Sequence, residues 1–419
     1  MLIHSIPNRT TCSYVLSSME SLRPITYDRS ISSTERIQVD MPAHHTGLVF
    51  DTRFLRHDTG VEDTVKTRHG SFHVSPEPHP SSSFIIQRIQ EFLTALHLTE
   101  RMVLIPTRAA SEDELSVYHT RDYIAGIRAC AAGGPRQGAW GDVDDETVIS
   151  AGSFEAALYA AGGAMNAVSA VLEGRVRNAY ALLRPPCHHA MSNRAMGFCI
   201  FNNTVIAAHH ARNAYGLERI MIVDWDVHHG NGTQDAFYKD PHVLFLSLHQ
   251  QDWFPHLGGE LEQVGSGAGV GYTVNIPLPP GTGDRGYRAA FEQLVLPIGR
   301  QFRPQLILIT AGQDASWLDP LAMMMMTMDG YRTISSLMVE LANEVCDGRL
   351  VMLHAGGYSA AYVPYCTVAA IEPLLGIDTG LIDLYQTSDE RKRCQTILTR
   401  ETLDALSAAR TWHRQWWQL

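Results

Sequence analysis

Four short segments of the chain gather residue types that carry hydrolytic chemistry. They contain histidines, aspartates and a tyrosine, and each directly follows an apolar run; the segments are 184–189, 224–232, 310–314 and 354–358. In open parallel sheets, ligands bind beyond the carboxyl ends of the strands. If the apolar runs are neighbouring parallel strands, the four segments therefore meet at one edge of a sheet, where metal-assisted hydrolysis becomes the chemistry to test.

The second segment has the spacing of metal ligands. Asp224, Asp226 and His228 alternate with period two, so if the strand continues through them, their side chains share one face. A carboxylate from a neighbouring strand, such as Asp314, would complete three protein ligands and leave one position open, as in catalytic zinc sites. Taken alone, each residue could equally be a helix cap or a surface group; the four clusters together favour a metal.

A metal-activated water needs a group that accepts its proton and a donor that stabilises the oxyanion. His188 and His189 are the candidates for the first role, and Tyr358 is the candidate for the second. Asp224 could then fix the orientation of one imidazole. Glycines 356 and 357 permit a tight turn that directs Tyr358 inward.

The apolar runs indicate a parallel sheet with both faces covered. Near-continuous Val, Ile and Leu predict strands at 103–106, 180–183, 220–223, 243–246, 306–309 and 350–353. Helical periodicity is clearest at 153–173, 203–215, 287–302 and 329–346. We therefore predict an α/β fold with a central, mainly parallel sheet flanked by helices and with the active site at the carboxyl ends of the strands.

Three regions are expected along the chain. Residues 1–45 are polar and predict an N-terminal arm, residues 46–380 form one domain, and residues 381–419 form a helical tail that packs on it. Segments 134–152 and 256–271 are long loops, for which function and plain irregularity remain equally open.

Composition narrows the classes of partner. Of 419 residues, 33 are Lys or Arg and 44 are Asp or Glu, a net charge of −11 that disfavours binding to a phosphate backbone. No apolar stretch reaches the length of a membrane span. The seven cysteines include no CxxC pair, which argues against a disulfide framework. We expect a soluble, cytoplasmic protein that binds neither nucleic acid nor membrane.

The chain resembles the histone deacetylase superfamily, specifically its class II-like and bacterial deacetylase-like amidohydrolases. Five motifs occur in the family's order, and the similarity spans about residues 47–376: RPPCHHA (184–190), MGFCIFNN (196–203), VDWDVHHGNGTQ (223–234), AGQDASWLDPL (311–321) and AGGYS (355–359). The resemblance implies the arginase/deacetylase fold. It also implies a zinc ion bound by Asp226, His228 and Asp314.

The same resemblance implies roles for the neighbouring residues. His188 and His189 become a general acid/base pair, Asp224 orients His188, and Tyr358 polarises the amide carbonyl. Asn231 follows the class II pattern at the position that supports the second histidine. A narrow channel for the acyl-lysine stem is implied at Gly197, Phe198, Phe254 and Leu321.

Members of the family also bind potassium or sodium as a structural ion. One such site is implied at Asp224, Asp226, His228, Ser247 and Leu248, and a second is suggested at Phe237, Asp240, Val243 and Tyr272.

Three positions depart from the family pattern. Cys187 replaces a glycine and could crowd the bases or make the site sensitive to oxidation. Gln313 replaces a common phenylalanine and could contact substrate or face solvent. Ala355 replaces the glutamate of EGGY and removes one supporting carboxylate.

The expected reaction is removal of acetyl or related acyl groups from lysine side chains or similar amines. Polyamine-selective relatives carry Glu at the position of Leu321, which favours acyl-lysine here. The acidic residues Asp142, Asp144, Asp145 and Glu146 could attract an acetylpolyamine instead, but a solvated turn explains them at least as well. Two other classes stay open, a dinuclear-metal ureohydrolase and a metal-bound but inactive binding protein. The arm and Trp412, Trp416 and Trp417 suggest a homo-oligomer.

Overall fold

The computed structural model describes residues 45–134, 137–138, 141–144, 146–386, 389 and 396–419. The chain divides into two units, residues 1–41 and residues 42–419, and every described residue belongs to the second. The predicted N-terminal arm therefore lies outside the described residues except for His45. The elements below all belong to residues 42–419.

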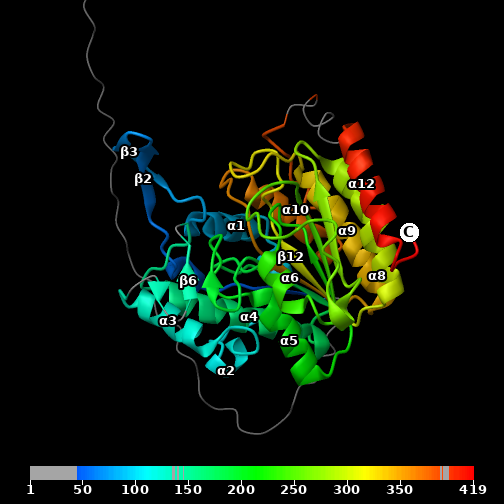
Figure 1. Ribbon diagram of the computed structural model, residues 1–419, viewed down its shortest axis with the longest axis horizontal. Coiled ribbons are helices and arrows are strands. Elements are labelled where there is room, and N and C mark those ends of the chain that lie inside the picture. The colour runs from blue at the N-terminus through cyan, green and yellow to red at the C-terminus, as the bar shows by residue number, and fades with distance from the viewer. Residues whose placement is uncertain (1–44, 135–136, 139–140, 145, 387–388, 390–395) are drawn as a thin grey trace, which may run out of the picture. The chain divides into compact units, whose positions relative to one another are not determined.

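Eight parallel strands form the central sheet, in the order β11-β10-β9-β12-β13-β7-β1-β4. Figure 1 labels β12 of this sheet. Their bounds are β1 (Thr46–Val49), β4 (Met102–Leu104), β7 (Asn178–Ala181), β9 (Ile220–Asp224), β10 (Val243–Gln250), β11 (Thr273–Leu278), β12 (Leu306–Ala311) and β13 (Leu350–His354). The predicted parallel α/β architecture is confirmed. Strand β9 pairs with both β10 and β12, which places it near the middle of the sheet.

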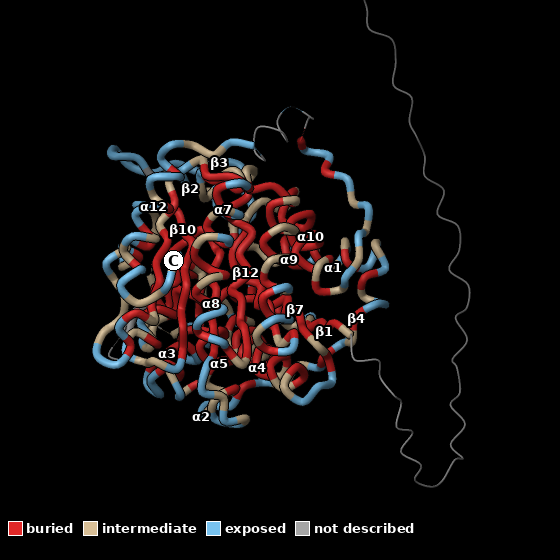
Figure 2. The backbone as a smooth tube through the Cα atoms, turned by 90° about the vertical axis from the view of Figure 1, so that its right-hand side faces the viewer, coloured by how far each residue is buried: buried red, intermediate tan, exposed pale blue. Residues whose placement is uncertain are grey.

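Alternation along the strands divides the core into two layers. Met221 and Val223 of β9 pack into one apolar cluster, whereas Ile220 and Ile222 pack into the other. Because both faces are buried, the strands are apolar throughout, and Figure 2 shows the sheet as an almost continuously buried region.

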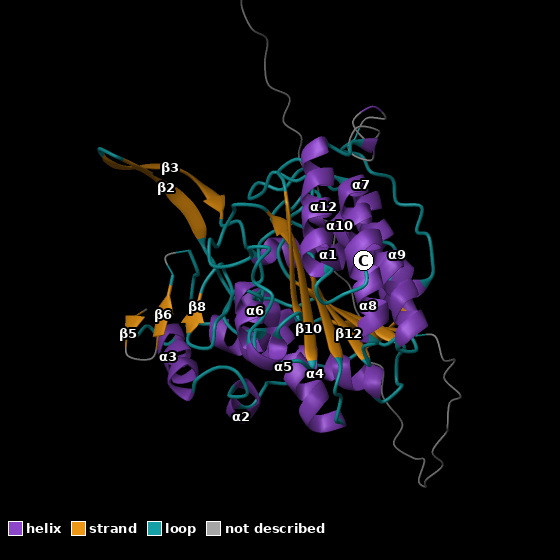
Figure 3. Cartoon of the chain, turned by 45° about the vertical axis from the view of Figure 1, so that its right-hand side comes forward, coloured by secondary structure: helices purple, strands orange, loops and turns teal. Residues whose placement is uncertain are grey.

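Helices cover each face (Figure 3). The first face carries α1 (Ser83–Ala95), α7 (Asp284–Ala290), α8 (Leu296–Phe302), α9 (Met328–Val345), α10 (Val363–Leu375) and α12 (Arg400–His413). The second carries α4 (Ser153–Leu172), α5 (Asn203–Tyr215) and α6 (Asn231–Phe237). Helix α4 packs closely because its residues are small: a Cβ at Gly162 would lie 1.9 Å from the carbonyl oxygen of Arg108.

Several elements were not predicted from the sequence, and one predicted helix is divided. The strands that were not predicted are β1, β11, the hairpin of β2 (Val61–Thr67) and β3 (Gly70–Pro78), and the small sheet of β5 (Gln137–Gly138), β6 (Gly141–Val143) and β8 (Arg194–Ala195). Helices α2 (Glu112–Leu115) and α3 (Arg121–Ala131) were also not anticipated. The single helix expected at 287–302 is instead α7, a π-helical turn (Phe291–Val295) and α8.

The C-terminal helix α12 packs against β11, the edge strand of the sheet. Trp417 donates its indole N–H to the carbonyl oxygen of Gly271 at 3.0 Å, and its ring lies 6.1 Å from that of Tyr272. A Cβ at Gly271 would lie 2.6 Å from Trp416, so this tryptophan also contacts the body. The docking of this segment covers the β11 edge, which would otherwise be exposed. Trp416 and Trp417, two of the three tryptophans that suggest an oligomer, contact the chain's own domain instead.

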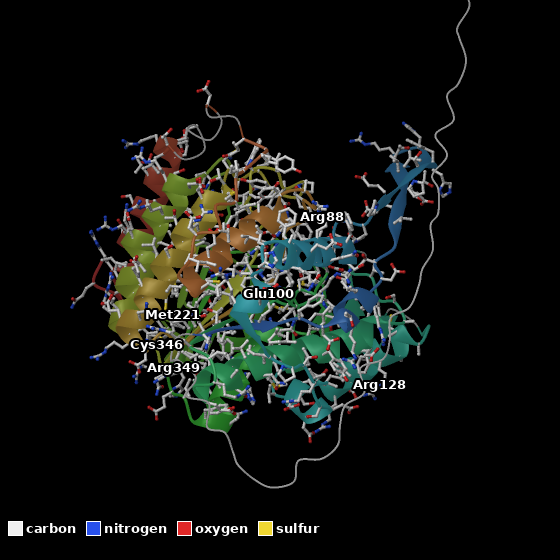
Figure 4. The ribbon with its side chains drawn as sticks, turned by 180° about the vertical axis from the view of Figure 1, so that it is seen from behind. Arg88, Glu100, Arg128, Met221, Cys346 and Arg349 are labelled. Carbon is white, nitrogen blue, oxygen red and sulfur yellow. The ribbon has the colours of Figure 1, made fainter. Side chains whose placement is uncertain are left out.

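The motif segments lie at one end of the sheet, and other parts of the chain lie at the opposite end. Viewed from behind in Figure 4, Met221, Cys346 and Arg349 lie toward the end at which the strands begin. The motif segments lie at the opposite end, where the strands finish. No helix within the described part of the chain is long and apolar enough to cross a lipid bilayer.

The packing predicts a stability difference between two leucines. Leu246 in β10 is fully buried, whereas Leu104 in the edge strand β4 is 67% exposed. We expect Leu246→Ala to lower the free energy of unfolding by about 2–5 kcal/mol, because it leaves a cavity in the core. Leu104→Ala should change it by less than about 0.5 kcal/mol. Urea unfolding of both variants measures this, and equal losses would contradict the assigned core.

Candidate active site

Strand β9 ends at Asp224, and residues 225–230 form the loop that follows it. The expectation that one strand presents Asp224, Asp226 and His228 is therefore wrong in its geometry. Hydrogen bonds bring these side chains together instead: the amide of Asp226 donates to Asp224 Oδ1 at 3.2 Å, and that of His228 donates to Asp226 Oδ1 at 3.0 Å. The amide of Val227 donates to Asp314 Oδ1 at 2.8 Å, which joins the loop to the end of β12.

Asp226, His228 and Asp314 form one compact cluster. One ligand atom from each lies within 4.8 Å of the other two, and all three residues are buried. His228 Nδ1 lies 3.2 Å from Asp226 Oδ1 and 3.2 Å from Asp314 Oδ2. Within the described ranges, this is the one group of His, Cys, Asp and Glu that could hold a metal ion.

Glycines bring the backbone close to these carboxylates. A Cβ at Gly312 would lie 2.4 Å from Asp226 Oδ2, and a Cβ at Gly356 would lie 2.2 Å from Asp314 Oδ2. The amide of Gly356 also donates to Asp226 Oδ2 at 2.7 Å. Any larger residue at either position would displace a carboxylate.

The charges of the cluster suit a divalent cation. Burial raises the pKa of Asp314 to about 7, with the neighbouring Asp226 carboxylate adding to the effect. Burial alone would lower the pKa of His228, but hydrogen bonds to Asp226 and Asp314 outweigh it and raise this pKa to about 10. The two buried carboxylates thus share one positive charge, that of the protonated His228 imidazole. A metal ion bound by the two carboxylates and the imidazole would neutralise the repulsion between the carboxylates.

His188 and His189 stand side by side with different partners. Their ring centroids are 3.9 Å apart. His188 Nδ1 lies 3.0 Å from Asp224 Oδ2, whereas His189 Nδ1 lies 2.7 Å from the amide oxygen of Asn231. One imidazole is therefore paired with a carboxylate and the other with a neutral amide.

This difference sets their basicities apart. Burial opposes protonation of both rings, but Asp226 and Asp224 raise the pKa of His188 to about 9. For His189, burial and the neighbouring His188 together lower the pKa well below its ordinary value. Adjacent groups with separated pKa values are typical of acid/base pairs.

A cavity of about 720 Å³ opens beside the cluster. The four residues expected in the substrate channel all line it, together with His189, His228 and Tyr358: they are Gly197, Phe198, Phe254 and Leu321. The rings of Phe198 and Tyr358 meet edge-to-face with centroids 5.5 Å apart. Burial raises the pKa of Tyr358 well above its ordinary value, so its hydroxyl keeps its proton.

Several residues at this cavity were not singled out from sequence. Asp319 accepts a hydrogen bond from the amide of Tyr358 at 2.7 Å, which fixes the backbone that carries the phenol. His79 and Trp253 line the cavity, as do the carboxylate-bearing Glu62 and Asp252. Asp319 lies inside the motif WLDPL, which could have marked it; no pattern marked the residues at the base of the β2–β3 hairpin.

The residues expected to bind monovalent cations fall into two places. Ser247 of β10 lies in register with Asp224 of β9, so the first set surrounds the base of the metal cluster. In the second set, the carboxylate of Asp240 pairs with Arg212, and Tyr272 packs against Trp417. The other apolar members of the two sets are buried: Leu248 of the first set lies in β10, and Val243 and Phe237 of the second lie in β10 and α6. Potassium or sodium binding stays a prediction.

The departures from the family pattern lie behind the cavity. The Cys187 thiol is fully buried, 3.4 Å from Thr204 Oγ1, and burial raises its pKa to about 12, which disfavours the reactive thiolate. Gln313 was expected to contact substrate or solvent; exposure to solvent is wrong, and Gln313 does not line the cavity. It is fully buried, and its amide donates to the Tyr180 hydroxyl at 3.5 Å. The Tyr180 hydroxyl also lies 2.9 Å from Nδ1 of His354, the residue before Ala355.

Comparisons with known proteins identify the family. A family model described as "Histone deacetylase domain" matches residues 79–374. The chain belongs to the histone deacetylase family. It is 40% identical over 306 residues to the "Histone deacetylase-like amidohydrolase" of Pseudomonas aeruginosa, covering 73% of this chain and 79% of that protein. It is 39% identical over 339 residues to the "Probable deacetylase" of Archaeoglobus fulgidus, covering 80% of this chain and 88% of that protein.

The fold comparison agrees. The crystal structure of the HDA15 HD domain matches with a TM-score of 0.76 and 32% sequence identity, covering 90% of this chain and 96% of that one. The expected family, the arginase/deacetylase-type fold and the hydrolytic class of enzyme are thus confirmed. The histone deacetylase family is zinc-dependent and acts on acetylated amines, and the Asp226–His228–Asp314 cluster is the candidate metal site of this member.

The cluster predicts the effect of losing one ligand. Asp314→Asn removes a charged donor, so we expect zinc affinity to fall by at least about 100-fold, since even residues that only support metal ligands contribute 10–100-fold. Zinc retained after dialysis against a weak chelator measures the loss. The control is Glu114→Gln, whose carboxylate pairs with Arg108 at 2.6 Å and lies outside the cluster. Equal zinc content in both variants would place the metal elsewhere.

Proposed function

We propose that this enzyme is a zinc-dependent amidohydrolase that removes acetyl or related acyl groups from lysine side chains or similar amines. The observation that carries the proposal is that His228 of the Asp226–His228–Asp314 cluster, His189 of the histidine pair and Tyr358 line one cavity. Water attacks the amide carbonyl, and the products are a carboxylic acid and a free amine.

The donor set of the cluster fits zinc, because two carboxylates and one imidazole leave a coordination position open. Bound there, zinc supplies a Lewis acid that polarises the amide carbonyl and lowers the pKa of the attacking water. Only one such cluster occurs among the residues that the structure describes, which argues against the dinuclear ureohydrolase alternative, since a two-metal site needs further bridging carboxylates.

The histidine pair moves the protons. His189 donates its Nδ1–H to Asn231, which leaves Nε2 with a free electron pair. We assign this nitrogen as the base that takes the proton of the attacking water. His188 donates its Nδ1–H to Asp224, and this carboxylate stabilises the imidazolium form. In the second step, the pair returns a proton to the leaving amine.

Tyr358 stabilises the oxyanion. Its hydroxyl stays protonated and can donate to the carbonyl oxygen as negative charge develops there. The hydrogen bond from its amide to Asp319 holds its backbone in place before substrate arrives. Preorganisation of this kind costs no rearrangement during the reaction.

The residues that line the cavity favour a linear acyl-amine. Phe198 and Phe254 offer aromatic walls to an alkyl stem, and Leu321 adds an apolar side chain. A second candidate, an acetylpolyamine, is supported by the carboxylates of Glu62, Glu146 and Asp252, because no Lys or Arg occurs among the described residues that line the cavity.

We further propose a cytoplasmic location, supported by the free cysteines of the described chain.

Acetate release tests the proposal. Zinc-loaded protein is incubated with an acetyl-lysine peptide, acetylputrescine and acetylspermidine under identical conditions. Peptide turnover that chelation abolishes supports lysine deacetylation. Turnover of the polyamines alone moves the substrate to small amines. No turnover on any of the three, nor on longer acyl-lysine peptides, would leave the inactive binding protein as the remaining interpretation.

Removal of one hydroxyl tests the mechanism. We expect Tyr358→Phe to retain zinc but to lower kcat by about 10²–10³, the typical effect of removing an oxyanion donor. Tyr365→Phe is the matched control, since Tyr365 is a buried tyrosine that does not line the cavity. Acetate release and bound zinc are measured on both variants, and unchanged turnover in Tyr358→Phe would refute its role.

A further inference from the structure

We propose that Asp144 and Thr147 are positioning residues that hold the Gly197–Phe198 turn, and that they influence turnover through Phe198. This inference rests on the proposed function, since Phe198 is a wall of the substrate cavity. It gives a role to part of the acidic segment 142–146, which the sequence left unassigned between a solvated turn and a source of charge.

The turn has a conformation that needs external support. Gly197 has φ 55° and Phe198 has φ 67°, both in the left-handed region that residues with a side chain rarely adopt. A Cβ at Gly197 would lie 2.4 Å from His189 Cδ2 and 2.9 Å from Phe254 Cε1. The turn is therefore packed between the base and the opposite aromatic wall. Strained conformations of this kind persist only where the surroundings impose them.

Two side chains of one loop supply that support. The amide of Gly197 donates to Asp144 Oδ2 at 2.8 Å, and the amide of Phe198 donates to Thr147 Oγ1 at 3.0 Å. The amide of Thr147 donates to Asp144 Oδ1 at 2.7 Å, so the two supports are joined. The two consecutive amides of the turn thus each donate a hydrogen bond to one of two side chains that lie next to each other in space.

The loop itself is anchored to the body. Strand β6 pairs in parallel with β8, which leads directly into the turn (Figure 3). The amide of Asp144 donates to the carbonyl oxygen of Ala195 at 3.1 Å, which continues this pairing. Thr147 is fully buried, so its hydroxyl is held within the protein rather than displayed to substrate. One carboxylate of the acidic segment is therefore engaged with the turn instead of the cavity mouth.

The ring of Phe198 transmits this placement to the reacting groups. It meets His79 edge-to-face at 5.0 Å and Tyr358 at 5.5 Å. His79 lines the cavity together with Glu146, which belongs to the same loop as the two positioning residues. Movement of the turn would thus shift the wall that contacts both the substrate stem and the catalytic phenol.

A double-mutant cycle tests the inference on the zinc-loaded full chain. Thr147→Val keeps the shape of the side chain but removes the acceptor for the Phe198 amide, and we expect kcat/KM on the best acyl-amide substrate to fall about tenfold. In a Phe198→Ala background, the same change should lower kcat/KM by less than about twofold, because the aromatic ring through which Thr147 acts is absent. Thr147→Ser restores the acceptor and should recover kcat/KM. Thr333→Val on α9 is the control for a distant threonine.

A second measurement does not depend on catalysis. Amide hydrogen exchange of Gly197 and Phe198 should accelerate in Thr147→Val, but not in Thr147→Ser or Thr333→Val. Equal losses of kcat/KM with and without the Phe198 ring, or unchanged exchange in Thr147→Val, would overturn the inference. If the wild-type protein hydrolyses no acyl amide, the proposed function fails, while the exchange result still decides whether Thr147 supports the turn.

Discussion

The structure depends on keeping two carboxylates close together away from water. Asp226 and Asp314 are fully buried, and each lies 3.2 Å from the same imidazole nitrogen of His228. Like charges in a poorly solvated site repel strongly unless a cation or hydrogen-bond donors lie between them. Backbone amides of the loop after β9 and of Gly356 supply donors, and the fold supplies glycines where a side chain would displace the carboxylates.

The parallel sheet makes this arrangement possible. Strands β9, β12 and β13 are adjacent and in register, so their last residues arrive at the same edge. Asp226 and His228 follow the first of these strands, Asp314 follows the second and Tyr358 follows the third. The helices on both faces bury the strands and thus fix these endpoints. The candidate catalytic groups come from distant parts of the sequence and consequently need only short loops to meet.

Much of this could be predicted from sequence because it depends on local patterns. Near-continuous apolar runs predicted β9, β10, β12 and β13, and the residues after them are those that the structure brings together. The prediction failed where tertiary contacts decide. The Asp224–Asp226–His228 spacing suggested an extended strand, but β9 ends at Asp224 and hydrogen bonds position the rest. Gln313 was expected near substrate or solvent, but a buried hydroxyl of Tyr180 holds it behind the cavity. The short strand β1 and the roles of Asp319 and Thr147 arise from contacts with distant residues, which no local pattern reveals.

Zinc titration of the metal-free protein tests the central claim most directly. Turnover of an acyl amide is measured as zinc is added in steps to the chelated protein. The geometry of a single Asp–His–Asp cluster predicts that activity is absent without metal, rises in proportion to added zinc and reaches its maximum at one zinc per chain. Full activity in the metal-free protein, or a requirement for two zinc ions per chain, would contradict the single-zinc mechanism.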